Sequence, residues 1–300
     1  MHTRTRNSTR TLRLMLAASF GAVLGMADAV RAQHNFLTNG DFTQGLQGWT
    51  VVGFADSPLV QSYDVTGRGA SSAFGCNPGN NQLPFLSLQQ TVLALPGTGT
   101  EFFANLAMES PGANASGGIV EVHIGPDLIA RHDFGAATPG VRRVALCGRI
   151  LPTVGGNQTL SITFSRPFLG LLGRTPRVWI DDMELTLSPG PSFTIDGSRR
   201  PNEQVTLRTQ GDPNDLFAVF VAGSRLPTGI TLPPFNGTWW LGPTGIAALW
   251  SGRLDAAGLA TLPITLPNDP GMSGVPLWFQ AAGASATLVT FGNAHDLGLH

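Results

Sequence analysis

Short stretches in which apolar and polar residues alternate recur along the chain after residue 32. In "VEVHIG" (120–125) and "LSITF" (160–164) every second residue is apolar, which is the period of a β-strand that buries one face. Clusters of glycine and proline such as "LPGTGT" (95–100) separate these stretches. No stretch after residue 32 keeps the period of a helix, so we expect an all-β protein, an antiparallel sandwich or jelly roll. The pattern predicts strands over 87–95, 101–108, 119–125, 141–148, 158–165 and 177–187.

A second series of strand-like stretches begins after "LSPGPS" (187–192). Two prolines and a glycine there end one strand before "SFTIDG" (192–197) begins another, which marks a domain boundary. Further on, stretches such as "LFAVFVAG" (216–223) continue the same pattern. We therefore expect an N-terminal jelly-roll β-sandwich over residues 33–188, followed by a second, smaller β-sandwich over residues 189–300.

The first 32 residues have the features of a secretory signal peptide. Four arginines precede the apolar run "LMLAASFGAVLGM" (14–26), and small residues around Ala32 offer a cleavage site. This run is too short to span a bilayer as a helix. We expect cleavage after Ala32 and export to the periplasm or the extracellular space, with no membrane span in the rest of the chain.

The charge of the chain argues against several classes of function. All 18 basic residues are arginines, and five of them lie in the first 32 positions with one of the 19 acids, so residues 33–300 carry 13 arginines against 18 acids. A mildly acidic protein without basic clusters argues against a nucleic-acid partner. The absence of lysine removes Schiff-base chemistry and the lysine of a phosphate-binding loop.

The chain has two cysteines, Cys76 and Cys147. Because an exported protein meets an oxidising environment, we expect a disulfide between them, which would close a loop of about 70 residues and stabilise the fold by about 4 kcal/mol. Two buried free thiols are the alternative, since the sequence does not show whether the two Cα atoms are close enough.

The sequence offers no catalytic motif. It has no Gly-x-Ser-x-Gly, no His-Glu-x-x-His and no Cys-x-x-Cys sequence. His132 and Asp133 are neighbours on an expected strand and face opposite ways, so they form no dyad. Glu121 and His123 share one face of a strand, where they could bind a metal or line a groove; solvent-facing polar residues are the simpler interpretation. We therefore expect that the protein is not an enzyme.

Three motifs of the first half occur in an order that is typical of one family. The stretch "NFLTNGDFTQGLQGWTVVG" (35–53) opens with an Asn-Gly turn and ends with Gly-x-x-Gly-Trp. A glycine- and serine-rich segment, "GRGASSAFG" (67–75), and the apolar-Asp-Asp-apolar element "WIDDMEL" (179–185) follow it. The set resembles carbohydrate-binding modules of families 4 and 9, which have the galactose-binding-like jelly-roll fold. The run "LPITLPNDP" (262–270) resembles small C-terminal β-domains of secreted planctomycete-type proteins, a resemblance that implies no activity.

The resemblance also implies a structural Ca²⁺ ion. Many members of these families hold the ion between the first motif, the glycine-rich segment and the last strand, which correspond here to Asp41, the carbonyl of Gly69, and Asp181. Such oxygen ligands suit Ca²⁺, although Thr43 stands where a glutamate is usual. Alternatively, Asp181 and Asp182 only hydrogen-bond the loop of the first motif. Because neighbours on a strand face opposite sides, we expect one of these two carboxylates on each face.

Sugar binding in such jelly rolls relies on exposed aromatic rings that stack on pyranose faces. We expect Trp49 and Trp179 in the core, and we take Tyr63, Phe85 and Trp239 as candidate ligand-binding residues. The expected function is non-catalytic binding of a polysaccharide or cell-surface glycan, or adhesion. The alternative is a structural envelope or matrix protein whose jelly roll binds no sugar.

Overall fold

The computed structural model describes residues 35–53, 55–78, 85–113, 115–167, 175–197, 202–269, 271, 275–285 and 288–296. Every extended regular element in these residues is a β-strand, which confirms the all-β prediction. The expected signal peptide, residues 1–32, lies outside the described residues. Within them, we find no helix with the length and apolar character that crossing a membrane requires.

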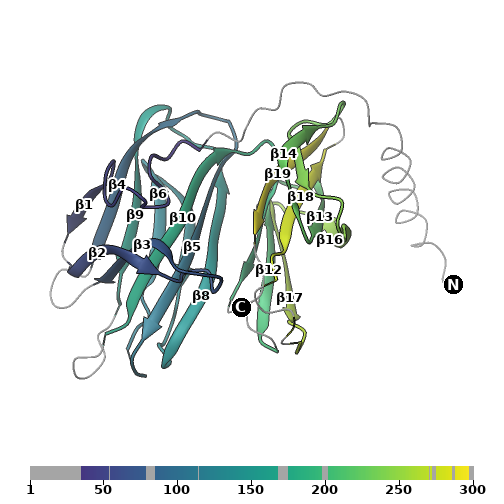
Figure 1. The fold of residues 1–300 in the computed structure, drawn as a ribbon. Helices are drawn as coiled ribbons and strands as arrows, with labels where there is room; N and C mark the ends of the chain where they lie inside the picture. Colours follow the sequence, from purple (N-terminus) through teal and green to yellow (C-terminus); the bar gives the residue numbers. More distant parts are fainter. Residues whose placement is uncertain are drawn as a thin grey trace.

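Ten strands form the first sandwich, whose two five-stranded sheets face each other (Figure 1). Sheet A has the strand order β1-β4-β9-β6-β7 and sheet B the order β2-β3-β10-β5-β8. All pairings in both sheets are antiparallel. The strands are β1 (Thr50–Gly53), β2 (Ala55–Tyr63), β3 (Ser71–Pro78), β4 (Phe85–Ala94), β5 (Thr100–Ser110), β6 (Ile119–Ile124), β7 (Asp127–Asp133), β8 (Gly140–Ile150), β9 (Gly156–Ser165) and β10 (Arg177–Leu187).

Alternation along these strands fills the space between sheets A and B. In β6, Val120, Val122 and Ile124 are buried and the residues between them are half-exposed, as the "VEVHIG" pattern predicts. Aromatic rings fill much of this core, and Trp49 is one of its members at 7% exposure. The prediction that Trp49 belongs to the core is therefore confirmed.

The remaining nine strands form the second sandwich. A three-stranded sheet has the order β11-β12-β17, a four-stranded sheet the order β16-β13-β18-β19, and β14 pairs with β15. Phe193, Phe217 and Phe279 lie in one apolar cluster of this sandwich, and Trp239 and Trp240 lie in another. The strands are β11 (Ser192–Asp196), β12 (Gln204–Gln210), β13 (Leu216–Ala222), β14 (Arg225–Thr231), β15 (Thr238–Leu241), β16 (Ala247–Arg253), β17 (Leu259–Thr265), β18 (Trp278–Ala284) and β19 (Val289–Asp296).

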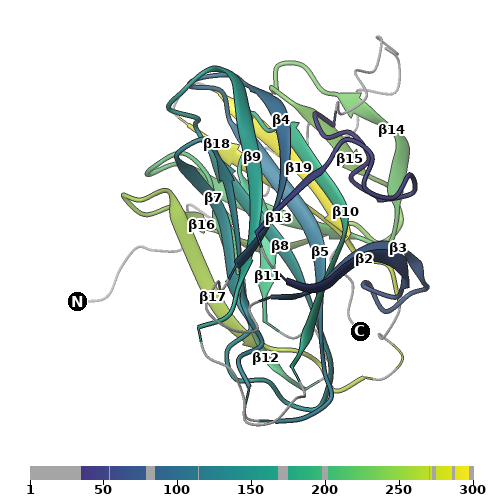
Figure 2. The same ribbon diagram turned by 90° about the vertical axis from the view of Figure 1, so that its left-hand side faces the viewer.

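Sheet B lies between sheet A and the second sandwich, so the molecule is built in stacked layers (Figure 1). From the side of the first sandwich, strands of sheet A such as β4 and β9 lie in front of the second sandwich (Figure 2). Phe103 of β5 and Ala145 of β8 point away from the first core and join the apolar cluster of Phe193 and Phe279. The outer face of sheet B is thus part of the core of the second sandwich.

The predicted disulfide is wrong, because Cys76 and Cys147 are both free thiols. Cys76 lies in β3 and Cys147 in β8, and sheet B places β10 and β5 between these strands. Three strand spacings amount to about 14 Å, whereas a disulfide needs Cα atoms less than about 7 Å apart. The two side chains also point to opposite faces, since Cys76 lies in the first core and Cys147 packs against the cluster that extends into the second sandwich.

Candidate functional site

The three motifs of the first half meet along β10. The Met183 amide donates a hydrogen bond of 3.0 Å to the Gly40 carbonyl, and the Asn35 side chain donates one of 3.1 Å to the Met183 carbonyl. From the middle motif, the Ser71 hydroxyl donates a hydrogen bond to the Asp181 carboxylate. Residues that are more than a hundred positions apart in the sequence therefore form one local structure at the centre of β10.

A β-bulge in β10 re-aims its carboxylates. Asp181 pairs with Asn105 of β5, and Glu184 pairs with Phe103. Three steps along β10 therefore match two steps along β5, so β10 contains one extra residue. The extra residue leaves Asp182 in the left-handed backbone region, at φ 51°, and its carboxylate accepts a hydrogen bond of 3.1 Å from the Asn105 side chain. Asp181 and Asp182 therefore both lie beside Asn105, which corrects the expectation that they face opposite sides.

Three carboxylates, those of Asp41, Asp181 and Asp182, lie near one another at the bulge. The pKa of Asp181 is raised to about 7, chiefly by burial and also by the charges of Asp182 and Asp41, against the opposing Ser71 hydrogen bond. Burial also raises the pKa of Asp182, with Asp41 again contributing. Asp181 is buried, whereas Asp41 and Asp182 are exposed, and the mutual repulsion of their charges indicates that the three carboxylates lie near one another. Carboxylate oxygens are hard ligands of the kind that Ca²⁺ prefers.

The glycine-rich segment also lies beside these carboxylates. Gly69 has a φ of 150°, and its amide donates a hydrogen bond of 3.3 Å to Asp64 Oδ1. Two positions further on, Ser71 contacts Asp181. All three segments that the resemblance assigns to Ca²⁺, those of Asp41, Gly69 and Asp181, are thus brought to one place.

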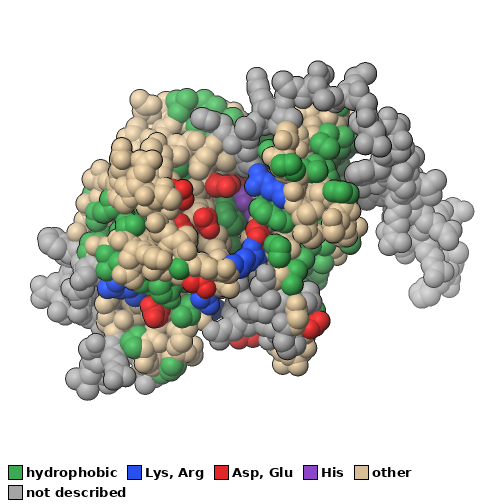
Figure 3. Space-filling view, in the orientation of Figure 1, with side chains coloured by type: hydrophobic (Ala, Val, Ile, Leu, Met, Phe, Trp, Pro, Cys, Tyr) green, Lys and Arg blue, Asp and Glu red, His purple; other side chains and the backbone are tan. Residues whose placement is uncertain are grey.

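A groove of about 240 Å³ opens beside the bulge, between the two sandwiches. In the space-filling view, acidic, arginine and histidine side chains gather around this hollow (Figure 3). The wall from the first sandwich consists of Thr66, Arg68, Phe103, Asn105, Asp182 and Glu184, and the wall from the second consists of Arg225, Trp278, Ala294, His295 and Asp296.

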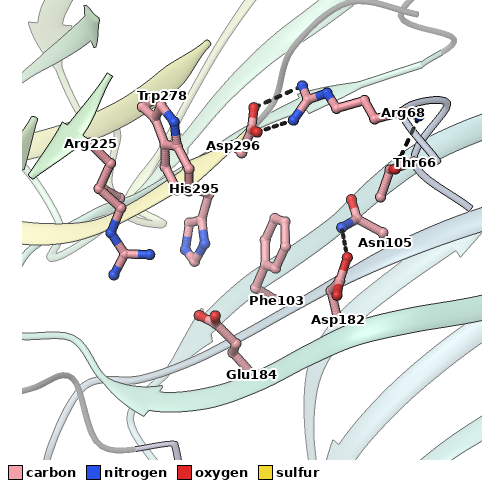
Figure 4. Close-up of a pocket in the computed structure, with 11 residues that line it drawn as sticks. Thr66, Arg68, Phe103, Asn105, Asp182, Glu184, Arg225, Trp278, His295 and Asp296 are labelled. Carbon is pink, nitrogen blue, oxygen red and sulfur yellow. Dashed lines mark hydrogen bonds and ion pairs between the residues drawn. The ribbon is translucent and has the colours of Figure 1, made fainter. Parts of the chain in front are cut away.

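Ring contacts and an ion pair fix the shape of the groove. The Arg225 guanidinium lies 4.7 Å from the ring centre of Trp240 and 5.2 Å from that of Trp278, so it is held against two indoles. At one end, Arg68 and Asp296 form a two-pronged ion pair that joins the two sandwiches (Figure 4). The groove is therefore an ordered site with an aromatic, an acidic and a cationic part.

The structure does not bring the three aromatic candidates together. Tyr63 stacks on Trp179 with ring centres 4.2 Å apart and planes within 7°, so one face of Tyr63 is already covered. Burial, and then the nearby charge of Glu109, raise the pKa of Tyr63 to about 12. Phe85 begins β4 in sheet A, whereas Tyr63 ends β2 in sheet B.

Trp239 does not provide the exposed ring that we expected. It is only 4% exposed, packs edge-on against Phe220 and Phe291, and donates a hydrogen bond of 2.9 Å to the Leu241 carbonyl. Neighbouring residues on a strand face opposite sides, but both sides of the short strand β15 are covered, since Arg225 lies over Trp240 on the other side. In this structure Trp239 offers no face to a ligand.

Only some of the groove residues could be predicted from the sequence. Asp182 and Glu184 lie within the "WIDDMEL" motif, which drew attention to this strand. Arg225 and Trp278 belong to no motif, and they meet the first sandwich only because two domains pack together. Trp179 is buried as predicted, but on the outer face of sheet B rather than between the sheets.

Comparisons with known proteins give only distant similarities. No family model matches the chain, and no curated protein matches it. Among solved structures, TmCBM61 in complex with β-1,4-galactotriose is 16% identical, with a TM-score of 0.34, over 51% of this chain and 99% of that one. The tandem CBM22 domains of Paenibacillus barcinonensis Xyn10C are 12% identical, with a TM-score of 0.37, over 91% and 92%.

The adhesin domain of Epf from Streptococcus pyogenes is 11% identical to this chain, with a TM-score of 0.31, over 90% of this chain and 99% of that one. The structural neighbours thus include carbohydrate-binding modules and an adhesin domain. At these scores the likeness transfers no ligand, activity or residue role, so the function must be argued from the groove itself.

Proposed function

We propose that this protein is exported and binds carbohydrate, without catalysis, in the groove between its two sandwiches. The observation that carries the proposal is the convergence of aromatic rings and planar polar side chains on one cavity. Pyranose rings stack their C–H faces on aromatic side chains, while neighbouring hydroxyls bind carboxylates, amides and guanidinium groups. Trp278, which is half-buried, supplies the ring that a sugar can stack on, and Asn105, Glu184 and Arg225 supply the polar groups (Figure 4).

The size of the groove defines the kind of ligand. Its volume of about 240 Å³ lies below the roughly 300–1,000 Å³ of sites that enclose a drug-sized molecule. We therefore assign it to a short portion of a glycan, such as a chain end, rather than to a long enclosed chain.

The carboxylates of the groove are arranged for binding rather than hydrolysis. Glycosidases hold two carboxyl groups on opposite sides of the bond that they cleave. Asp182 and Glu184 both lie on β10, on the same side of the groove. The carboxylate across the groove is that of Asp296, which forms an ion pair with Arg68. This arrangement supports a non-catalytic role.

We further propose that Ca²⁺ binds at Asp41, Asp181 and the Gly69 segment and stabilises the bulge. Asp182, next to Asp181, lines the groove, so the ion would fix the backbone of the sugar site. Export is supported by the signal-peptide features of residues 1–32.

A glycan array probed with the mature chain tests the proposal. We expect retention on a defined group of glycans, and at least about tenfold weaker retention for Trp278→Ala. Trp250→Ala is the matched control, because Trp250 is also a partly buried indole of the second sandwich but does not line the groove. Retention of no glycan, or equal loss in both variants, would count against the site. Mass spectrometry of the bound glycan should detect no cleavage.

A further inference from the structure

A buried cluster of potential metal ligands lies in the interface between the two sandwiches. Glu101 of β5, Cys147 of β8 and His295 of β19 each offer one ligand atom, and these three atoms lie within 4.8 Å of one another. The side chains of Glu101 and His295 are 0% and 4% exposed. None of the three is a predicted ligand of Ca²⁺.

The spacing of the ligand atoms suits a small tetrahedral ion. His295 Nε2 lies 3.2 Å from Glu101 Oε1, and Cys147 Sγ lies 3.3 Å from the same oxygen. Bonds of about 2.0–2.3 Å at tetrahedral angles place zinc ligand atoms roughly 3.3–3.6 Å apart. Only small shifts are needed to seat an ion among the three.

Neighbouring groups orient two of these ligands. Asn293 donates hydrogen bonds of 2.7 Å to Glu101 Oε2 and to the Thr186 hydroxyl, so Oε2 is occupied and Oε1 is directed at His295 and Cys147. The imidazole of His295 stacks on the Phe103 ring with centres 4.3 Å apart and planes within 6°. Such supporting contacts are typical of protein metal sites, where they fix the ligands before the ion binds.

Charge also favours an ion at this place. A bound divalent cation stabilises the Cys147 thiolate, and the thiol proton is released to solvent. With one thiolate, one carboxylate and one neutral imidazole, the occupied site carries no net charge.

We propose that Glu101, Cys147 and His295 bind Zn²⁺, or a transition-metal dication of similar chemistry, and thereby clamp the two sandwiches together. Thiolate and imidazole ligands select such ions over Ca²⁺. The competing account is a metal-free hydrogen-bonded cluster in which Glu101 accepts from Cys147, Asn293 and His295.

Cobalt provides a direct test, since Co²⁺ replaces Zn²⁺ and reports its ligands by absorption. Metal-depleted mature protein is titrated with CoCl₂ alone, and then with ZnSO₄. We expect a thiolate-to-cobalt charge-transfer band, tetrahedral d–d bands, and displacement of both by stoichiometric Zn²⁺. Cys147→Ser should lose the charge-transfer band, while Cys76→Ser should retain it, because Cys76 is the other buried thiol of the chain and lies outside the cluster.

A second variant guards against loss of folding in Cys147→Ser. His295→Gln should bind Co²⁺ at least tenfold more weakly. His123→Gln, changed on β6 of sheet A and outside the cluster, should bind it as the parent does. The proposal is overturned if the folded parent protein shows no charge-transfer band with excess Co²⁺, or if Cys76→Ser removes the band and Cys147→Ser does not. Neither result depends on sugar binding.

Discussion

The Met183 amide donates its hydrogen bond to the Gly40 carbonyl, and this contact joins the motif at residues 35–53 to the bulge that shapes the groove. Met183 is itself buried in the first core, between residues of β10 that face the opposite side. Through this contact, the Asn-Gly turn of the first motif holds the bulge of β10. The bulge in turn positions the carboxylates that line the groove.

Gly40→Ala tests this link. A Cβ at position 40 would lie 2.2 Å from the Met183 carbonyl oxygen, so the backbone of the first motif or of the bulge must move. We expect a loss of more than about 1 kcal/mol in the free energy of unfolding, measured by denaturant titration. Gly112→Ala is the control, because a Cβ at position 112 meets nothing within 4 Å. Equal stability of the two variants would show that the contact is unimportant.

Calcium should stabilise the mature protein after metal depletion. Addition of CaCl₂ alone to one hundred times its dissociation constant would raise the free energy of unfolding by about 2.7 kcal/mol, visible as a higher melting temperature. Asp181→Asn should abolish this increase but keep the response to ZnSO₄. Cys147→Ser should show the reverse pattern. An unchanged melting temperature with CaCl₂ would contradict the Ca²⁺ proposal.

His132 should make the protein less stable in acid. Burial, and then the nearby charge of Arg142, lower the pKa of His132 from 6.5 to about 4 in the folded state. Between these values the unfolded chain binds the extra proton, so stability falls as the pH drops from 6.5 and is lower by about 3 kcal/mol below pH 4.

The measurement is the difference in unfolding free energy between His132→Gln and the parent, taken from pH 7.5 to pH 4, so that other titrating groups cancel. The variant should gain on the parent as the pH falls. His123→Gln, in which His132 is intact, should keep the parent's pH dependence. A constant difference between His132→Gln and the parent across this range would contradict the argument.

Glu184→Gln should weaken glycan binding by about tenfold, or about 1.4 kcal/mol, because the carboxylate loses its charge-assisted hydrogen bonds to sugar hydroxyls. Titration calorimetry with a glycan retained on the array measures the effect. Glu121→Gln is the matched control, since Glu121 is a partly exposed strand carboxylate that pairs with Arg131 in sheet A. Equal affinities for the parent and Glu184→Gln would remove Glu184 from the site.

Strands with clear alternation could be predicted well from the sequence. The prediction over 177–187 coincides with β10, and those over 119–125 and 158–165 differ from β6 and β9 by one or two residues at an end. The strands β2 and β3 were not predicted individually, because neither has an unbroken alternation of apolar and polar residues. Local periodicity therefore guides the prediction best in β6 and β9, where buried and more exposed residues alternate.

The site depends on information that periodicity does not contain. The sequence does not give the order of strands in a sheet, and that order separates Cys76 from Cys147 and rules out their disulfide. The bulge between Asp181 and Glu184 likewise leaves no clear mark in the alternation. Arg225 reaches the groove only through the packing of one sandwich on the other, which no local motif encodes.

A crystal structure of the mature protein with the best-retained glycan tests the central claim most directly. We expect the sugar in the groove between the sandwiches, in contact with Glu184 and stacked on Trp278. Sugar bound elsewhere on the molecule, or a protein that retains no glycan of the array, would contradict the assignment of this groove as the carbohydrate site.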